Sequence, residues 1–401
     1  MKSSSILFIT ILLRYITSIR IPLVRTYRQR GGRFLMDNEH DVNLTSVQDV
    51  YYHGPLIVGN QTYNIIFDTG SSLTFVPHSE LRDSKPNTVD CEASPSCESA
   101  GSQFDVRYGS GRVKGELVYE RVSLAEAELD QYKMGLATDV GFPDFAKEDY
   151  HGICGLAWPS LSSDYDVLPI VLALHQAEQI PKALFAMYLT EGGGELVLGE
   201  TDPDQYVGNI TWVPLTQRAW WTVGLVGVEI NSDPVLASLS DVLIVDSGTS
   251  LVSGPRAKVA ALVLALETHS GVAISETDVA LGVQYSVKCV DSAKLADAQV
   301  AFALQGGDEV VQIFSVSGES LIVGRISSSH CLLGISGSSD EGWILGASWL
   351  RSFYTIYDYD NSAVGFAVAK PAEGFAAVTA SDSLPPPSAF ALVLLLAVLI
   401  L

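Results

Sequence analysis

Two short segments of this 401-residue chain repeat one pattern, and each holds a single aspartate that could take part in acid–base chemistry. Residues 65–72 read IIFDTGSS and residues 243–250 read LIVDSGTS, which places Asp68 and Asp246 at the same point of the repeat. The three apolar residues are typical of a buried strand, and the glycine two positions after each aspartate allows a tight turn. Neighbouring hydroxyl groups can hydrogen-bond the carboxylates and fix their orientation. The repeat therefore predicts two matching strand-to-turn sites.

The repeat also predicts a chemistry, provided that the two turns meet. Asp68 and Asp246 would then share a site in which both cannot easily ionise at once, so the pair holds one proton and its two pKa values move apart. The ionised member can accept a proton from a bound water while the protonated member polarises a substrate carbonyl. Such a pair could hydrolyse a peptide bond without a covalent intermediate, a metal ion or a cofactor.

The elements that must position these turns are mostly strands. Short β-branched and aromatic runs, broken by Gly, Asn, Asp and Pro, recur at residues 63–67, 195–198, 354–357 and 364–368. This pattern of short strand-forming runs separated by turn residues predicts an all-β fold. A second repeated pair, residues 153–156 (ICGL) and 344–347 (ILGA), follows each aspartate at a similar separation, which indicates two halves built on one plan.

Helical periodicity is rare and is clearest after Pro255. Four apolar residues there fall at i, i+3, i+4 and i+7, namely Val259, Leu262, Val263 and Leu266. A second helix is expected from about Leu168 to Gln179. The sequence thus predicts a fold in which helices only supplement the strands.

From about Val50 to Ala369 the sequence resembles the pepsin family of aspartic peptidases, and the two aspartate segments carry the likeness. Residues 104–111 (FDVRYGSG) resemble the family's flap, a hairpin that closes over bound peptide. Residues 152–159 (GICGLAWP) and 343–346 (WILG) are similar to the two stretches that thread behind the catalytic turns. The resemblance implies a bilobal all-β fold, in which two β-barrel lobes related by a pseudo-twofold axis flank a central cleft for an extended peptide.

The resemblance also implies roles for residues around the aspartates. The flap, the catalytic turns and an apolar wall would contact substrate through Tyr108, Gly109, Ser110, Gly70, Ser71, Gly248, Thr249 and Ile153. Apolar pockets would favour apolar side chains on either side of the cleaved bond. The implied function is an aspartic endopeptidase that hydrolyses proteins at acidic pH, with Asp68 and Asp246 as its catalytic residues. Its catalytic unit would be monomeric, because both half-sites lie in one chain.

The first segment departs from the family at one position. The family has a tryptophan two residues before the proline of residues 73–77 (LTFVP), where this chain has Phe75. Tryptophan there gives the flap tyrosine a hydrogen-bond partner, whereas phenylalanine cannot donate a hydrogen bond. We therefore expect Tyr108 to bond elsewhere or to be more mobile.

The five cysteines cannot all pair within one chain. Their placement indicates two local disulfides, Cys91–Cys97 and Cys289–Cys331, and this pairing also fits the family. Cys154 is left over in an apolar run, so we expect a buried apolar residue rather than a reactive thiol. No Cys or His spacing in the sequence indicates a metal site.

Both ends of the chain point to the secretory pathway. Residues 1–18 are predicted to be a signal peptide and residues 19–45 a basic propeptide. Residues 46–202 and 203–370 are expected to form the N-terminal and C-terminal lobes. Residues 371–401 combine a Pro/Ser linker with a hydrophobic C-terminal anchor signal. This segment matches the signal for a glycolipid anchor, and a tail-anchored helix is the alternative.

The leader and three sequons extend this prediction. Residues 20–25 (RIPLVR) resemble the start of a pepsinogen-type prosegment, which lies across the cleft, but the leader is short and has no evident counterpart of the lysine that contacts the dyad. Autoinhibition by the leader is therefore a hypothesis. Potential N-glycosylation sites are Asn43, Asn60 and Asn209. The expected location is the cell surface, a vacuolar or endolysosomal membrane, or the outside of the cell.

Charge and motif arrangement limit the alternatives. The formal net charge of −22 disfavours nucleic acid as a partner, so polypeptide substrates remain the expected ones. Glycoside hydrolases also use two acidic residues, but these need not lie in two matching turns. A catalytically inactive peptide-binding surface protein of the same fold is the other alternative. The intact aspartates, both turn glycines and Tyr108 favour an enzyme.

Overall fold

The structure is a computed structural model that describes residues 18–31, 45–81, 85, 87–279 and 282–371. Contacts divide the chain into two compact units, Met1–Lys370 and Pro371–Leu401. Nearly all described residues belong to the first unit. Three sequence predictions lie outside the described residues: the signal peptide, the sequon at Asn43 and the C-terminal anchor. Residue 18 of the predicted signal peptide and residue 371 of the C-terminal segment are the exceptions. No helix in the described ranges is long and apolar enough to span a membrane.

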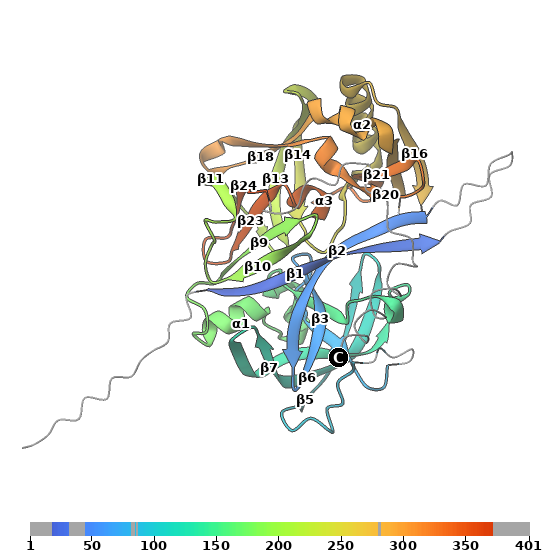
Figure 1. Ribbon diagram of the computed structural model, residues 1–401. Helices are drawn as coiled ribbons and strands as arrows, with labels where there is room; N and C mark the ends of the chain where they lie inside the picture. Colours follow the sequence, from blue (N-terminus) through green and yellow to red (C-terminus); the bar gives the residue numbers. More distant parts are fainter. Residues whose placement is uncertain (1–17, 32–44, 82–84, 86, 280–281, 372–401) are drawn as a thin grey trace, which may run out of the picture. The chain divides into compact units, whose positions relative to one another are not determined.

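Strands dominate the first unit, so the all-β prediction is confirmed (Figure 1). They form a 13-stranded and an 11-stranded sheet. The order in the first sheet is β11 (Tyr206–Pro214), β24 (Ala363–Ala369), β23 (Phe353–Asp358), β9 (Leu184–Thr190), β10 (Gly193–Leu198), β1 (Ile19–Gly31), β2 (Thr45–Val58), β3 (Gln61–Asp68), β8 (Gly152–Gly155), β4 (Phe75–Pro77), β7 (Ala127–Val140), β6 (Gly111–Leu124) and β5 (Glu98–Tyr108).

The second sheet contains most of the C-terminal half. Its order is β16 (Ile274–Val279), β17 (Gly282–Lys288), β21 (His330–Ser338), β15 (Val252–Pro255), β22 (Trp343–Leu345), β14 (Asp233–Val245), β13 (Trp221–Ile230), β18 (Gln299–Gln305) and β19 (Val311–Ser317). Two short strands lie off this path: β12 (Gln217–Arg218) pairs with β13, and β20 (Ile322–Arg325) pairs with β21.

The helices are few and short. The α-helices are α1 (Ile170–Gln176), α2 (Arg256–Ser270) and α3 (Ala347–Leu350), and the 3-10 helices are η1 (Phe145–Lys147), η2 (Pro159–Tyr165), η3 (Cys289–Asp297), η4 (Gly307–Glu309) and η5 (Glu319–Leu321). The α2 prediction is confirmed, because its four periodic apolar residues are buried and Gly271 ends it in the left-handed conformation at φ 66°. Helix α1 is shorter than expected, since it begins after Pro169 and ends at Gln176.

The two halves repeat one local arrangement behind the aspartates. In the first half, β3 runs parallel to β8 and pairs Asp68 with Gly155. In the second half, β14 runs parallel to β22 and pairs Val245 with Leu345. The apolar residues that precede each aspartate are largely buried, as a strand inside a sheet requires. This confirms the prediction that two glycine-containing stretches thread behind the turns.

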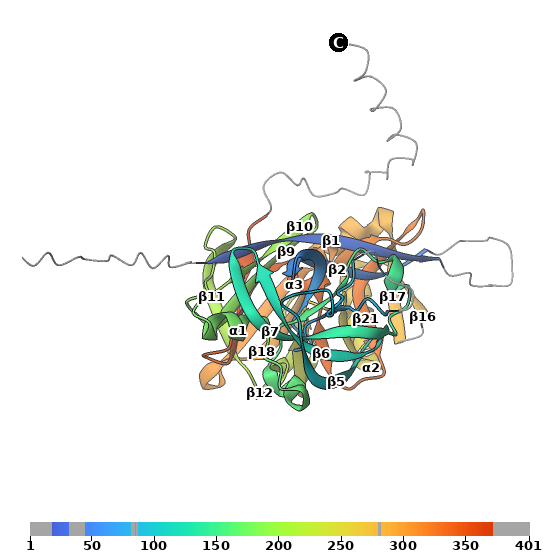
Figure 2. The same cartoon turned by 90° about the horizontal axis from the view of Figure 1, so that it is seen from below.

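Strand β1 contains much of the segment predicted to be a propeptide. It pairs antiparallel with both β10 and β2, and Figure 2 shows it beside them. Its alternating residues Ile19, Ile21 and Leu23 are buried in the main core, and Arg20 forms an ion pair with Asp202. The segment therefore contributes both backbone pairing and core side chains. The domain boundaries at residues 45, 202 and 370 stay predictions.

The cysteines adopt the predicted pairing. The structure contains the disulfides Cys91–Cys97 and Cys289–Cys331. Cys154 is free and fully buried, and its sulfur accepts a hydrogen bond from Thr74 Oγ1 at 3.4 Å. Burial raises the pKa of the Cys154 thiol to about 12, so this thiol stays protonated and unreactive at physiological pH.

Candidate active site

The two predicted turns meet, although 178 residues separate their aspartates in the sequence. Asp68 ends β3, and Asp246 follows the last residue of β14. A Cβ atom placed on Gly248 would lie 2.2 Å from Asp68 Oδ1, and one placed on Gly70 would lie 2.7 Å from Asp246 Oδ1. Each glycine therefore lets its own turn approach the carboxylate of the other turn. No side chain larger than hydrogen fits at either position without displacing a carboxylate.

The first turn orients its carboxylate with two hydrogen bonds. The Gly70 backbone N–H donates to Asp68 Oδ1 at 2.8 Å. The Ser71 hydroxyl donates to Asp68 Oδ2 at 2.5 Å. Both oxygens of Asp68 thus have a donor from within the turn, which fixes the plane of the carboxyl group.

The second turn repeats this arrangement with threonine in place of serine. The Gly248 backbone N–H donates to Asp246 Oδ1 at 2.8 Å, and the Thr249 hydroxyl donates to Asp246 Oδ2 at 2.6 Å. The two carboxylates therefore have equivalent donors at nearly equal distances. This pseudo-symmetric pair is what the repeated sequence predicts.

A second set of hydroxyl groups ties the two turns to each other. Thr69 Oγ1 donates to the Val245 carbonyl at 2.9 Å, and Ser247 Oγ donates to the Phe67 carbonyl at 2.7 Å. Each hydroxyl also accepts the backbone N–H of the other residue, at 2.9 and 3.1 Å. We call Thr69 and Ser247 the cross-brace. Sequence reasoning assigned the hydroxyls near each aspartate only to the carboxylates, and it missed this exchange between the halves.

Burial and mutual repulsion control the ionisation of the pair. Asp68 is 6% exposed and Asp246 is 8% exposed. Burial raises the pKa of Asp68, the nearby Asp246 raises it further, and the hydrogen bonds from Ser71 and Gly70 oppose this rise. The pair therefore retains a proton above the pH at which an isolated carboxyl group loses it.

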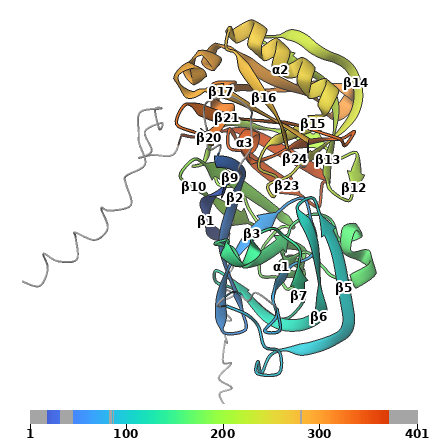
Figure 3. The ribbon, with the colours of Figure 1, turned by 90° about the vertical axis from the view of Figure 1, so that its right-hand side faces the viewer.

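The predicted flap is an antiparallel hairpin of β5 and β6, which Figure 3 shows beside β7. Tyr108 pairs with Gly111 at its end, and the turn residues Gly109 and Ser110 are exposed. The Tyr108 ring packs edge-on against Phe142 with centroids 5.4 Å apart. This places the tyrosine at the inner side of a hairpin whose tip faces solvent.

Phe75 changes the surroundings of the flap tyrosine. Its ring centroid lies 6.1 Å from that of Tyr108, so the contact between them is apolar. The Tyr108 hydroxyl is inaccessible to water and has no hydrogen-bond partner within the described residues. Burial and the charge of Asp68 raise its pKa. The sequence predicts either another partner or greater mobility. No such partner is found among the described residues, and the mobility stays a prediction.

Ile153 lies where an apolar wall was expected. It is almost fully buried on β8, pairs with Ile66 of β3 and with Phe75 of β4, and belongs to the apolar cluster that also contacts Tyr108. The flap and the strand behind the first turn therefore share one apolar cluster. Contact of Ile153 with a bound peptide stays a prediction.

One residue near the first turn was not identified from the sequence. Trp220 lies between β12 and β13 in the C-terminal half, and its indole Nε1–H donates to the Gly70 carbonyl at 3.1 Å. The indole thus reaches the turn that contains Asp68. A tryptophan between two short strands has no sequence pattern that predicts such a contact.

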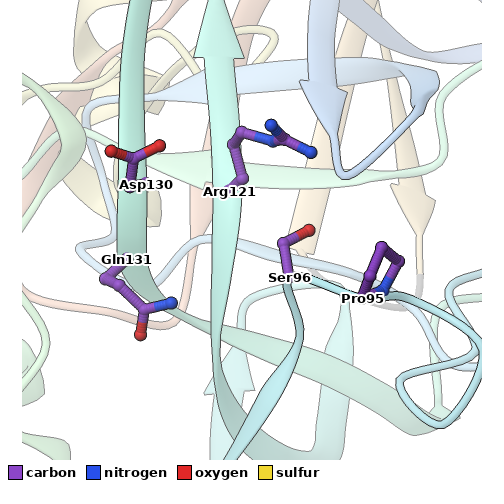
Figure 4. A pocket seen from close by; sticks show the side chains of 5 residues that line it. All are labelled: Pro95, Ser96, Arg121, Asp130 and Gln131. Atoms are coloured by element: carbon purple, nitrogen blue, oxygen red, sulfur yellow. The ribbon is translucent and has the colours of Figure 1, made fainter.

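A separate cavity of about 330 Å³ lies beside the Cys91–Cys97 loop. It is lined by Pro95, Ser96, Arg121, Asp130 and Gln131 (Figure 4). Figure 4 shows the Arg121 side chain extending away from Asp130. The cavity shares no residue with the aspartate turns or with the end of the flap at residues 108–111. The paired aspartates, and not this cavity, therefore form the candidate active site.

Comparison with known proteins agrees with this geometry. The profile of the family described as Eukaryotic aspartyl protease matches residues 51–369. Cathepsin D of Gallus gallus is 31% identical over 343 residues, which cover 81% of this chain and 82% of that protein. Renin of Rattus norvegicus is 28% identical over 347 residues (82% and 82%), and chymosin of Camelus dromedarius is 28% identical over 334 residues (81% and 83%). The chain therefore belongs to the eukaryotic aspartyl protease family and is an aspartic protease with the pepsin-like fold.

Proposed function

We propose that the protein is an acid-active endopeptidase that hydrolyses peptide bonds with a water molecule activated between Asp68 and Asp246. The observation that carries this proposal is the buried pair of carboxylates, each oriented by equivalent hydrogen bonds from its own turn. Burial and repulsion keep one proton on the pair, so one member can act as a base while the other acts as an acid.

The reaction follows from this division of roles. The ionised carboxylate accepts a proton from water as the water oxygen attacks the carbonyl carbon of the substrate. The protonated carboxyl donates its proton to the carbonyl oxygen, which gives a neutral tetrahedral intermediate. The carboxyl that accepted the water proton then donates it to the amide nitrogen, and the other carboxylate accepts a proton from a hydroxyl of the intermediate. The C–N bond breaks, and an acid and an amine leave. The pair returns to its starting state with one proton.

Substrate recognition is proposed to involve the flap, both turns and the apolar wall. Tyr108, Gly109 and Ser110 would cover an extended peptide, and Ile153 would contact an apolar side chain beside the cleaved bond. Main-chain groups of the turns would contact the peptide through Gly70, Ser71, Gly248 and Thr249. The proposal is supported by the exposed hairpin tip and by the apolar cluster beneath it.

The test is cleavage of a denatured protein such as haemoglobin at pH 3 to 6, with and without a statine-type transition-state inhibitor. Inhibitor-sensitive cleavage that disappears in both Asp68→Asn and Asp246→Asn is expected. Cleavage that survives either substitution would overturn the two-aspartate mechanism. Binding of the inhibitor without any cleavage by the wild type would favour a peptide-binding protein instead.

We also propose that the protein passes through the secretory pathway. The two disulfides support this, because such bonds persist in oxidising compartments. Asn60 lies exposed at the turn between β2 and β3, and Asn209 lies exposed at an irregularity of β11, so both are accessible to glycosylation. Enzymatic removal of N-glycans should reduce the apparent mass, and an Asn60→Gln, Asn209→Gln variant should lose most of that reduction.

Attachment of residues 371–401 to a membrane through a glycolipid is a further part of this proposal. The support is the apolar C-terminal sequence itself. Release of the protein from cells by a phosphatidylinositol-specific phospholipase is the expected result. Retention in the membrane after that treatment would favour a tail-anchored helix.

The leader is proposed to control activity as a propeptide. Arg25 of β1 is buried, and its guanidinium donates to the Glu191 carbonyl at 3.2 Å and to the Val323 carbonyl at 3.4 Å. These contacts support a leader that holds parts of both halves together. The test compares the activity of the full-length precursor with that of a trimmed form at neutral and at acidic pH. Equal activities at both pH values would contradict autoinhibition.

A further inference from the structure

The turn between β12 and β13 is fixed to the N-terminal half by its backbone. The Ala219 carbonyl accepts the Trp158 backbone N–H at 3.1 Å, and the Arg218 carbonyl accepts the Ser160 hydroxyl at 2.6 Å. On the next residue, the Trp221 indole donates to the Leu156 carbonyl at 2.9 Å and is fully buried. The main chain on both sides of Trp220 is therefore held in place.

The Trp220 side chain is held much less firmly than its backbone. It is 37% exposed, and its one hydrogen bond in the structure is the bond from Nε1 to the Gly70 carbonyl. A single hydrogen bond at a solvent-accessible position contributes little net free energy, because water can replace it. The indole can thus leave this carbonyl by side-chain rotation without disturbing the turn that carries it.

The carbonyl that Trp220 occupies belongs to the substrate site. Gly70 donates its N–H to Asp68 and approaches Asp246, so its peptide group lies directly beside the dyad. An extended peptide needs backbone acceptors for its N–H groups along the cleft, as in the addition of a strand to a sheet. The Gly248 carbonyl in the other turn accepts no hydrogen bond from the described residues. The carbonyl on the Asp68 side thus already accepts one hydrogen bond, whereas its counterpart on the Asp246 side accepts none from the described residues.

We propose that Trp220 is a gate that makes cleavage depend on the length of the peptide. In the free enzyme the indole N–H donates to the Gly70 carbonyl, and a peptide long enough to reach this carbonyl competes with the indole when it donates its own main-chain N–H. A shorter peptide leaves the indole in place and gains nothing from this acceptor. Trp220 is thus a specificity-determining residue for extended peptides on one side of the cleaved bond.

The kinetic test uses Trp220→Phe, which keeps an aromatic ring but removes the N–H donor. Matched peptides share the residues around the cleaved bond and are lengthened stepwise at one end or the other. The ratio of kcat/KM for long over short peptides should rise about three- to ten-fold in this variant, through a lower KM, for lengthening at one end only. An unchanged ratio at both ends would overturn the gate.

A matched control and a second measurement accompany this test. Trp212→Phe removes the N–H of another exposed tryptophan, which is 40% exposed on β11, and should keep the wild-type ratio. Addition of a long statine-type inhibitor should change the tryptophan emission of the wild type and of Trp212→Phe, and the change should be much smaller in Trp220→Phe. An equal change in all three proteins would show that the indole does not move.

The gate rests on the proposed peptidase function, but the two ideas fail in different ways. Absence of Asp68-dependent cleavage in the wild type would refute the function. If the wild type cleaves peptides and Trp220→Phe has the same kinetics as the wild type at every peptide length, the gate alone is refuted.

Discussion

The two turns that carry Asp68 and Asp246 share their internal hydrogen bonds but not their surroundings. In both, a glycine N–H and a hydroxyl three residues after the aspartate donate to the carboxylate. The first turn carries the aspartate whose charge acts on the flap tyrosine Tyr108, and its glycine carbonyl accepts a hydrogen bond from the indole of Trp220. The parts that repeat build the proton-holding pair. We propose that the parts that do not repeat select the substrate.

The strongest test of the equivalence of the two turns is removal of either charge. Asp68→Asn and Asp246→Asn should each lower kcat/KM by at least about 10²–10⁴-fold, because each removes one partner of the acid–base pair. Cleavage of a peptide across pH 3 to 6 measures this, and thermal unfolding checks that both variants fold. A much smaller loss in one variant would show that the turns are not equivalent in catalysis.

Substitutions in the cross-brace test whether the two turns contribute equally to stability. Thr69→Val and Ser247→Ala each remove one hydroxyl that both donates to and accepts from the backbone of the opposite half. Each should lower the free energy of unfolding by about 1–3 kcal/mol, since buried backbone groups are left unpaired. Urea unfolding provides the measurement. The two losses should be similar, and a loss confined to one variant would contradict a symmetric brace.

The raised pKa of Asp68 predicts how stability depends on pH. Because the pKa is higher in the folded than in the unfolded chain, this carboxyl contributes stability below the unfolded pKa and loses it as the pH rises through the folded value. The protein should therefore become less stable from acidic toward neutral pH. Asp68→Asn should flatten this part of the profile. A wild-type profile identical to that of Asp68→Asn would count against the raised pKa.

The hydroxyls on the carboxylates should shift the pH dependence of activity. The Ser71 hydrogen bond lowers the pKa of Asp68, so Ser71→Ala should raise that pKa and move the alkaline limb of the kcat/KM profile to higher pH. Thr249→Val is the matched change on the second turn. A shift to lower pH in Ser71→Ala would contradict this assignment.

Substitution of Phe75 is expected to have the smallest effect on catalysis and inhibitor binding. It changes the surroundings of the first turn and leaves the second turn as it is. Phe75→Trp introduces an indole N–H next to Tyr108, whose hydroxyl lacks a partner. One added hydrogen bond of about 1 kcal/mol should change KM and inhibitor affinity several-fold, because it restrains the flap. Inhibitor titration is the direct measurement. Unchanged catalysis and affinity would show that the missing donor has no consequence for the flap.

Much of the site was predictable because it depends on local sequence. The strand, aspartate and glycine of each turn are contiguous, and Gly70 and Gly248 meet a steric requirement that any tight approach of two turns imposes. The periodic residues of α2 fix its buried face in the same local way. The cysteine placement and the family resemblance together gave the correct disulfides.

Contacts between distant segments were decided only by the tertiary structure. Thr69 and Ser247 are 178 residues apart, and Trp220 is 150 residues from Gly70. The packing of β1 into the first sheet likewise depends on partners far along the chain. The sequence determined two equivalent acidic turns through patterns of a few residues. The exchange of hydroxyls between them, and the indole that covers one of them, arise because folding brings separate halves to within hydrogen-bond distance, which no local pattern encodes.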